Sequence, residues 1–270
     1  MHSKDLLFID TTLRQAGSLI LSAFGEKVQS TQKKEKSQIV TALDLASETL
    51  IISAIKNSYP QSSVLAEESG LLIKDDADYW VVDPIDGTSN FANGIPWFGV
   101  MIAHVREGDA VASGIYLPVS DEMYLAEKNK GAFKNGMRFE VSREANLTKT
   151  LVGYGMDGSE TSCSYQKKAG IFKALLPNVL NLRSTNSAVD YAYAAEGKLG
   201  GLINLENRIW DVAPIVPIAR EAGCIVSDVF GKPLSFQKEN MNASRNFTLL
   251  LASQPLHAAL LTIIRPVLSE

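Results

Sequence analysis

Hydrophobic residues near the start of the chain recur at the spacing of a buried helix face. Six of them lie three or four positions apart: Leu6, Ile9, Leu13, Ala16, Ile20 and Phe24. A second helix is predicted from Thr41 to Tyr59, because Thr41 and Asp44 have the spacing of a capping box. The residues expected to form its buried face are Leu43, Ala46, Leu50, Ala54 and Ile55. The charged run 32–37 between the helices is expected to be an exposed loop.

After residue 60 the pattern changes to short apolar runs that are typical of buried strands. In the first half of the chain, strands are predicted at 63–66, 79–82, 98–105, 110–116 and 123–126. Asn135-Gly136 predicts a hairpin turn. In the second half, strands at 151–154, 179–182, 200–204, 224–226 and 247–252 alternate with helices at 165–175, 188–195, 210–222 and from 256.

This mixture of strands and helices predicts a layered α/β (α+β) structure. We divide it into an N-terminal half, residues 1–145, and a C-terminal half, residues 146–270. The candidate metal site is expected in the first half. The second half is expected to contribute Asp211 and the substrate contacts.

Composition narrows the class of protein. The 270 residues are 46% hydrophobic and 21% charged, which excludes a disordered chain and a coiled coil. Cys163 and Cys224 form no C-x-x-C pair, which argues against a disulfide scaffold and a zinc cage. No segment resembles a signal peptide or a membrane span, so a cytoplasmic protein without a membrane partner is expected. The formal charge of −4 argues against direct nucleic-acid binding and requires a local positive site for any anionic ligand.

The segment that follows the predicted strand 79–82 has the strongest chemical pattern. Asp83 and Asp86 come at the end of a buried run, and such a pair of carboxylates is costly unless a cation lies between them. Pro84 makes the intervening turn rigid, so that both carboxylates can face one cavity. If Gly87 and Thr88 open a helix, their amides can bind an anion. The alternative is that Asp-Pro-x-Asp-Gly is only a surface turn.

Two further segments repeat this placement of acids. Glu67-Glu68 follows the strand 63–66, and Trp210-Asp211 begins a predicted helix. Carboxylates without nearby His or Cys suit Mg²⁺ better than zinc. None of the histidines, serines or cysteines is placed as an evident nucleophile, and a two-metal site can instead activate water for attack on a phosphate ester.

These pieces together resemble the inositol monophosphatase family of Mg²⁺-dependent, lithium-sensitive phosphatases. The matching segments occur in the family's order: 40–44, 66–69, 80–91, 131–136, 209–213 and 221–223. The resemblance implies a layered α-β-α-β-α sandwich and two or three bound Mg²⁺ ions. It also implies a small phosphorylated substrate and a homodimer.

The resemblance also implies roles for individual residues. The metal ligands would be Glu67, Asp83, Asp86, Asp211 and the carbonyl of Ile85. Glu67 and Thr88 would orient the attacking water, with Asp44 acting beside Thr88.

The implied substrate contacts come from both halves of the chain. They are Asp86, the amides of Gly87 and Thr88, and the side chains of Ser187, Ala188 and Asn204. Lys33 would lie in a loop that closes toward the metals.

Two positions depart from the family pattern. Relatives that hydrolyse inositol phosphates have a Glu seven residues before the Asp of Trp-Asp, whereas this chain has Asn204 there and Glu206 two residues later. Pro214 suits the first turn of a helix, but Pro217 is expected to weaken or bend the helix 210–222. The sequence therefore does not decide the identity of the substrate.

The favoured function is a Mg²⁺-dependent phosphomonoesterase for a small polyol or sugar phosphate, with inositol monophosphate first. Alternative substrates are fructose 1,6-bisphosphate, histidinol phosphate and 3′-phosphoadenosine 5′-phosphate. A haloacid-dehalogenase enzyme is disfavoured, because Pro84 stands where the nucleophilic Asp of that class belongs. A regulatory binding protein on the same fold is the alternative from another class.

Overall fold

The two N-terminal segments with helical spacing form helices α1 (Lys4–Ser22) and α2 (Ala42–Ser58). The computed structural model describes residues 3–25, 30–32, 39–72, 77–156, 162–237 and 245–269. The predicted capping box at the start of α2 is confirmed, because the Thr41 side chain accepts from the Asp44 amide and the Asp44 carboxylate accepts from the Thr41 amide. Lys33 and most of the predicted loop 32–37 lie outside the described residues.

The face that α2 buries differs from the predicted one. Of the five residues expected there, only Ile55 is fully buried. The buried residues are Asp44, Ser47, Glu48, Ile51, Ile52 and Ile55. The prediction failed because the first half of α2 packs through polar side chains, which a hydrophobic pattern cannot locate.

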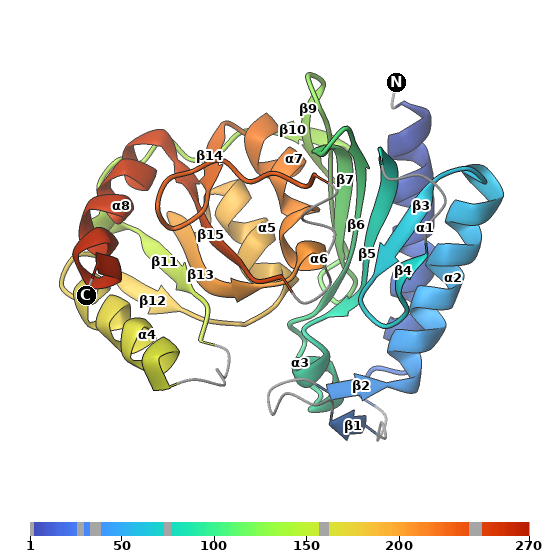
Figure 1. Cartoon of the computed structure of the whole chain (residues 1–270), viewed down its shortest axis with the longest axis horizontal. Helices are drawn as coiled ribbons and strands as arrows, with labels where there is room; N and C mark the ends of the chain where they lie inside the picture. The colour runs from blue at the N-terminus through green and yellow to red at the C-terminus, as the bar shows by residue number, and fades with distance from the viewer. Residues whose placement is uncertain are drawn as a thin grey trace.

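An eight-stranded sheet lies beside α1 and α2, on the right of Figure 1. Its strand order is β10-β9-β8-β7-β6-β5-β3-β4, and all neighbours are antiparallel except β3 and β5. The strands are β3 (Ser63–Ala66), β4 (Gly70–Leu72), β5 (Asp78–Asp86), β6 (Gly99–Arg106), β7 (Asp109–Leu117), β8 (Glu122–Glu127), β9 (Gly131–Lys134) and β10 (Met137–Phe139). Short α3 (Thr88–Ala92) follows β5. A separate pair, β1 (Ser30–Gln32) and β2 (Ile39–Thr41), was not predicted, and neither was β4.

The hairpin predicted at Asn135-Gly136 is confirmed. It joins β9 to β10, and both turn residues have positive φ, 47° for Asn135 and 78° for Gly136. Positive φ at both central positions is the requirement of a type I′ turn, which Asn-Gly satisfies at little cost.

A second sheet of five strands has the order β12-β11-β13-β15-β14. Its strands are β11 (Leu151–Tyr154), β12 (Asn181–Arg183), β13 (Gly201–Asn207), β14 (Cys224–Ser227) and β15 (Phe247–Ser253). The helices of this half are α4 (Ser162–Leu175), α5 (Ala188–Glu196), α6 (Ile209–Val212), α7 (Ile215–Glu221) and α8 (Gln254–Ser269). A 3₁₀ turn, η1 (Leu147–Lys149), precedes β11.

The predicted helix 210–222 is interrupted between α6 and α7. Pro214 and Pro217 have no N–H, so the carbonyls of Trp210 and Ala213 cannot make their helical hydrogen bonds. The interruption falls one turn before Pro217 and is the effect expected of that residue.

Three clusters of buried side chains hold five layers together. One cluster joins α1 and α2 to the first sheet, and another joins α4 and α8 to the second sheet. The largest cluster contains residues of both sheets and of the helices α5, α6 and α7, which lie between the sheets (Figure 1). The order helix, sheet, helix, sheet, helix confirms the predicted α-β-α-β-α sandwich. No helix in the described part of the chain is long and apolar enough to cross a membrane.

A charged network fixes the start of α1 to the first sheet. The two ring nitrogens of His104, on β6, each lie 3.0 Å from a carboxylate oxygen, one of Asp5 and one of Asp78. Asp5 also accepts a hydrogen bond from Tyr59 at 2.7 Å and pairs with Arg106 at 3.3 Å. Burial alone would raise the pKa of Asp5, but the hydrogen bonds from His104 and Tyr59 and the charges of His104 and Arg106 outweigh it and lower this pKa to about 2.

This network makes stability depend on pH in a defined direction. A carboxylate whose pKa is lowered by folding stabilises the protein above its unfolded pKa of 3.8, and this contribution is lost as the pH falls toward about 2. We expect Asp5→Asn to lower the free energy of unfolding by about 1–3 kcal/mol near neutral pH. The difference from wild type should shrink below pH 4. Urea unfolding of both proteins at several pH values measures this, and a difference that does not change with pH would contradict it.

Candidate metal centre

The end of β5 brings Asp83 and Asp86 to one side of the sheet. Residues three apart on a regular strand point to opposite faces. Between these two residues the pairing with β6 is irregular, because the step from Asp83 to Asp86 faces only the step from Met101 to Gly99. Such a bulge turns the second side chain toward the side of the first. Within it, the carbonyl of Pro84 accepts a hydrogen bond from the Ser47 hydroxyl of α2 at 3.0 Å.

Asp211 reaches the same place from the second half of the chain. It lies in α6, and its Oδ2 accepts a hydrogen bond from the Arg208 amide at 2.6 Å. Asp83, Asp86 and Asp211 each offer one carboxylate oxygen, and these three oxygens lie within 4.8 Å of one another. Figure 1 shows why, since α6 lies against β5 and β6 between the sheets. Three of the four predicted carboxylates therefore form one cluster.

Glu67 lies at the same end of the sheet, in the turn after β3. β3 runs parallel to β5 with Ala66 opposite Val82, and the Glu67 amide donates to the Val82 carbonyl at 3.2 Å. The next residue of β5 is Asp83, and the Glu67 carboxylate contributes to raising the pKa of Asp83. The four predicted acidic ligands thus interact at one place.

The cluster is electrostatically unfavourable by itself. Asp83 is 1% exposed, and its Oδ1 is buried without a hydrogen-bond partner among the described residues. Burial, and after it the charges of Glu67, Asp86, Asp211 and Asp44, raise the pKa of Asp83 well above its usual range. A buried acceptor beside other carboxylates, in a set of oxygen donors, fits a hard divalent cation.

Asp44 and Thr88 form a second part of the site. Thr88 Oγ1 lies 2.9 Å from Asp44 Oδ1 and 2.8 Å from the carbonyl oxygen of Ile85. The other oxygen of Asp44 accepts from the amide of Thr41 at 2.7 Å and from its hydroxyl at 2.6 Å. Asp44 is fully buried, so these contacts fix the position of the Thr88 hydroxyl.

Gly87 allows two distant segments to meet. It has φ of +94° and is the N-cap residue of α3, which begins at Thr88. A Cβ at this position would lie 2.7 Å from the Trp97 carbonyl oxygen and 2.9 Å from Ser187 Cβ. Ser187 caps the N-terminus of α5, so the structure brings this predicted substrate contact next to Gly87. Ala188 follows it and is fully buried.

Asn204, the other predicted substrate contact, lies on β13 and is 7% exposed. Its Oδ1 accepts from the Glu206 amide at 3.1 Å, and its side chain lies against Gly155, where a Cβ would come within 2.4 Å. Glu206 forms an ion pair with the buried Lys168 at 3.0 Å. Glu206 is therefore held by Lys168. The roles of Ser187, Ala188 and Asn204 as substrate contacts stay predictions.

Sequence reasoning missed Ser47 and Glu48 of α2. Both are buried, and both contact segments that carry the predicted ligands. Their signal was present, because Asp44, Ser47 and Glu48 lie three and four residues apart on one helix face. It went unused because these residues are polar.

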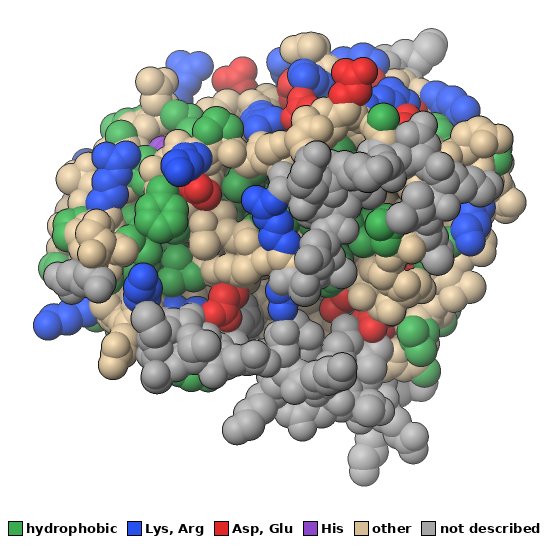
Figure 2. Space-filling model, viewed as in Figure 1, with side chains coloured by type: hydrophobic (Ala, Val, Ile, Leu, Met, Phe, Trp, Pro, Cys, Tyr) green, Lys and Arg blue, Asp and Glu red, His purple; other side chains and the backbone are tan. Residues whose placement is uncertain are grey.

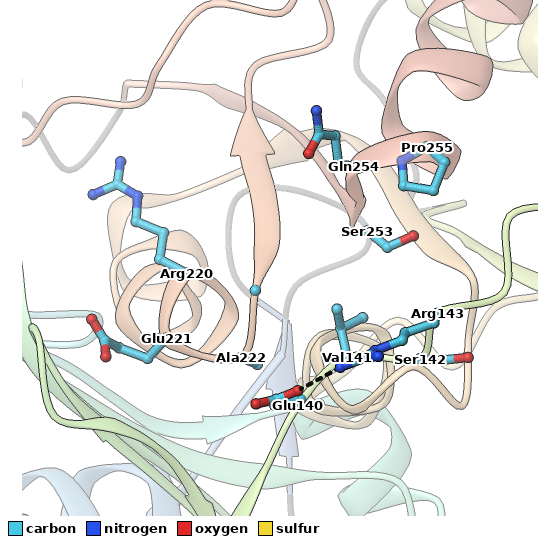
Figure 3. A pocket seen from close by; sticks show the side chains of 11 residues that line it. Glu140, Val141, Ser142, Arg143, Arg220, Glu221, Ala222, Ser253, Gln254 and Pro255 are labelled. Carbon is cyan, nitrogen blue, oxygen red and sulfur yellow. Dashed lines mark ion pairs between the residues drawn. The ribbon is translucent and has the colours of Figure 1, made fainter.

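A hollow of about 400 Å³ lies elsewhere, between α7, β15 and the segment 140–143 (Figure 3). It contains Glu140 and Arg143, which form an ion pair at 3.7 Å. The carboxylate of Glu221, on α7, accepts from the amides of Asn129 and Gly131, both at 2.7 Å. The acids here are thus paired with cations or amides, unlike Asp83.

The layered fold carries a carboxylate cluster that could hold a metal ion. The chain belongs to the inositol monophosphatase family, whose model matches residues 3–265.

Relatives with known names and structures span nearly the same length. Nus factor SuhB of Vibrio cholerae is 35% identical over 237 residues, which cover 86% of this chain and 87% of that protein. Nus factor SuhB of Escherichia coli K12 is 36% identical over 224 residues, covering 81% and 82%. The extragenic suppressor protein SuhB of Bartonella henselae superimposes with a TM-score of 0.88 at 28% identity, over 97% of this chain and 99% of that one. The IMPase of Thermotoga maritima gives 0.87 at 26% identity, over 99% of each.

Proposed function

We propose that this protein is a Mg²⁺-dependent phosphomonoesterase that hydrolyses a small polyol or sugar phosphate, with inositol monophosphate as the first candidate. The observation that carries the proposal is that oxygens of Asp83, Asp86 and Asp211 lie within 4.8 Å of one another, while the buried Asp83 Oδ1 has no hydrogen-bond partner among the described residues. Membership of the inositol monophosphatase family supports it.

In this proposal Glu67, Asp83, Asp86, Asp211 and the Ile85 carbonyl hold two or three Mg²⁺ ions. Bound Mg²⁺ would supply Lewis-acid stabilisation of phosphate charge and lower the pKa of water.

Side chains and backbone amides of the chain would position the attacking water and bind the phosphate. Asp44 accepts a hydrogen bond from the Thr88 hydroxyl, so a lone pair of Thr88 Oγ1 can accept a hydrogen bond from the attacking water. Glu67 accepts a second hydrogen bond from that water and fixes its direction. Gly87 can adopt its φ of +94° because it has no Cβ, and this conformation leaves the amides of Gly87 and Thr88 able to bind phosphate oxygens.

Substrate choice is assigned to residues of the second half. Ser187 lies against Gly87 and Asn204 offers a neutral amide, so we propose that Ser187, Ala188 and Asn204 contact the part of the substrate beyond the phosphate. Because Asn204 Oδ1 already accepts from the Glu206 amide, its NH₂ group is the part suited to a ligand. Lithium sensitivity, a homodimer and a cytoplasmic location belong to the same proposal.

A phosphate-release assay tests the proposed function. The substrates are inositol monophosphate, fructose 1,6-bisphosphate, adenosine bisphosphate, histidinol phosphate and glycerol phosphate, each with and without Mg²⁺ and Li⁺. We expect Mg²⁺-dependent release that is fastest with inositol monophosphate and is inhibited by Li⁺. Absence of release from every ester in the presence of Mg²⁺ would contradict the proposal.

A regulatory protein on the same fold is the second candidate, because several relatives have the name Nus factor SuhB. On the face shown in Figure 2, lysine and arginine side chains lie among acidic, neutral and hydrophobic ones. The proposal that the chain does not bind nucleic acid directly depends on its formal charge of −4. Titration calorimetry without Mg²⁺ binding, together with absence of hydrolysis, would favour the regulatory function.

A further inference from the structure

The first half of α2 directs three polar side chains at three separate segments of the site. Asp44 contacts Thr88, Ser47 contacts the Pro84 carbonyl, and Glu48 contacts the turn that contains Glu67. All three are at most 1% exposed. The role of Asp44 belongs to the proposed function, whereas Glu48 has no role in it.

Glu48 holds the turn after β3 with both of its oxygens. Oε2 accepts from the Glu68 amide at 2.8 Å, and Oε1 accepts from the Ser69 amide at 2.9 Å and also from the Ser69 hydroxyl. The Glu67 amide donates to Val82 of β5. The amides of three consecutive residues are therefore fixed, one by the sheet and two by α2.

We propose that Glu48 is a positioning residue for the metal centre. By fixing the backbone on the C-terminal side of Glu67, it orients the Glu67 carboxylate toward Asp83 and thereby raises the affinity for the cation. This inference deepens the proposed function and depends on Glu67 being a metal ligand. Among the described residues, the Glu48 carboxylate binds only two backbone amides and one hydroxyl. A buried carboxylate with these partners is a costly way to fix a turn, since apolar packing is often at least as stabilising. The contacts of Glu48 are explained if the position of this turn determines where the Glu67 carboxylate lies as a metal ligand.

A second glutamate, which is only partly buried, makes a comparable arrangement and serves as a control. Glu221, on α7, also accepts from two amides of a turn, those of Asn129 and Gly131, both at 2.7 Å. Figure 3 shows Glu221 beside Arg220 on its helix. That turn joins β8 to β9 and contains no proposed site residue.

The experiment compares Glu48→Gln with Glu221→Gln in the full chain. Gln replaces one acceptor oxygen by an NH₂ group, which then faces a backbone N–H instead of accepting from it. Mn²⁺ binding is measured by electron paramagnetic resonance, thermal unfolding is measured in EDTA, and kcat is measured over a range of Mg²⁺ concentrations. We expect both variants to unfold at lower temperature than wild type, while only Glu48→Gln weakens Mn²⁺ binding, by roughly tenfold or more. Saturating Mg²⁺ should return kcat of Glu48→Gln close to the wild-type value.

Two results would overturn the inference: Mn²⁺ affinity of Glu48→Gln equal to that of wild type, or equal losses of affinity in both variants. If Glu48→Gln does not fold, Ser69→Ala removes only the hydroxyl contact and should weaken Mn²⁺ binding by about twofold to fivefold, a smaller outer-shell effect. An unchanged affinity in that variant would overturn the inference as well. Wild-type protein that binds Mn²⁺ without releasing phosphate overturns the hydrolase function alone, because Mn²⁺ affinity still tests the role of Glu48.

Discussion

Asp83→Asn should abolish phosphate release and, at the same time, stabilise the metal-free protein. The carboxylate of Asp83 is buried beside Glu67, Asp86 and Asp211, so its charge is unfavourable until a cation binds. An Asn side chain removes that charge, and its NH₂ group can donate to a neighbouring carboxylate. We expect the free energy of unfolding in EDTA to rise by about 1–3 kcal/mol. We expect phosphate release to fall by roughly a thousandfold or more, because several kcal/mol of transition-state stabilisation depend on the metal.

The stability and the activity of Asp83→Asn are measured separately. Urea unfolding in EDTA gives the stability, and a phosphate-release assay at saturating Mg²⁺ gives the activity. Addition of Mg²⁺ should stabilise the wild type and leave Asp83→Asn unchanged, because only a folded state that binds the ligand gains stability from it. Near-normal turnover, or a large loss of stability in EDTA, would contradict the assignment of Asp83 as a metal ligand.

Gly87→Ala should lower both the stability and the activity of the protein. The residue has φ of +94°, which is strained for any residue with a Cβ, and the new methyl would lie 2.7 Å from the Trp97 carbonyl oxygen and 2.9 Å from Ser187 Cβ. Strain and clash together should lower the free energy of unfolding by roughly 2–4 kcal/mol. Displacing the Gly87 and Thr88 amides should also lower kcat by about a hundredfold, as for loss of an anion-stabilising donor.

Gly94→Ala is the matched control for this change. Gly94 lies just after α3 with φ of +71°, and a Cβ there would have no heavy atom within 4 Å. This variant should show the backbone strain without the clash, so its loss of stability should stay near 1 kcal/mol and its kcat near that of wild type. Equal kcat values for the two variants would show that the space around Gly87 is not part of the site.

The carboxylates of the proposed metal centre could be located from sequence because each lies at or next to an end of a regular element. Asp83 and Asp86 come at the end of a buried strand, and Glu67 follows a strand that pairs with it in parallel, so that both carboxyl ends lie at one edge. Asp211 comes from a helix between the sheets. The predicted strands, the Asn135-Gly136 turn and the layered fold were recoverable for the same reason, since local pattern and tertiary packing agree there.

Other features depended on tertiary contacts that a local pattern does not contain. The bulge between Asp83 and Asp86 is a property of the pairing with β6 and cannot be recognised in either strand alone. The burial of Ser47 and Glu48 was missed because these side chains serve neighbouring backbone groups rather than a hydrophobic core. The sequence did contain a signal for their burial, because Ser47 and Glu48 follow Asp44 of the capping box at helical spacing.

The division into halves shows the same limit. Each predicted half contains one of the two large sheets, yet the largest buried cluster includes side chains from both. A boundary near residue 145 therefore stays a prediction. The two halves share one buried cluster, which the order of elements along the chain does not reveal.

Anomalous X-ray diffraction from crystals grown with Mn²⁺ in place of Mg²⁺ would show whether these carboxylates bind a metal ion. We expect Mn²⁺ peaks bound by oxygens of Glu67, Asp83, Asp86 and Asp211, with the Ile85 carbonyl completing the set. Mn²⁺ bound elsewhere, or its absence from a crystal in which these four carboxylates lie as described, would contradict it.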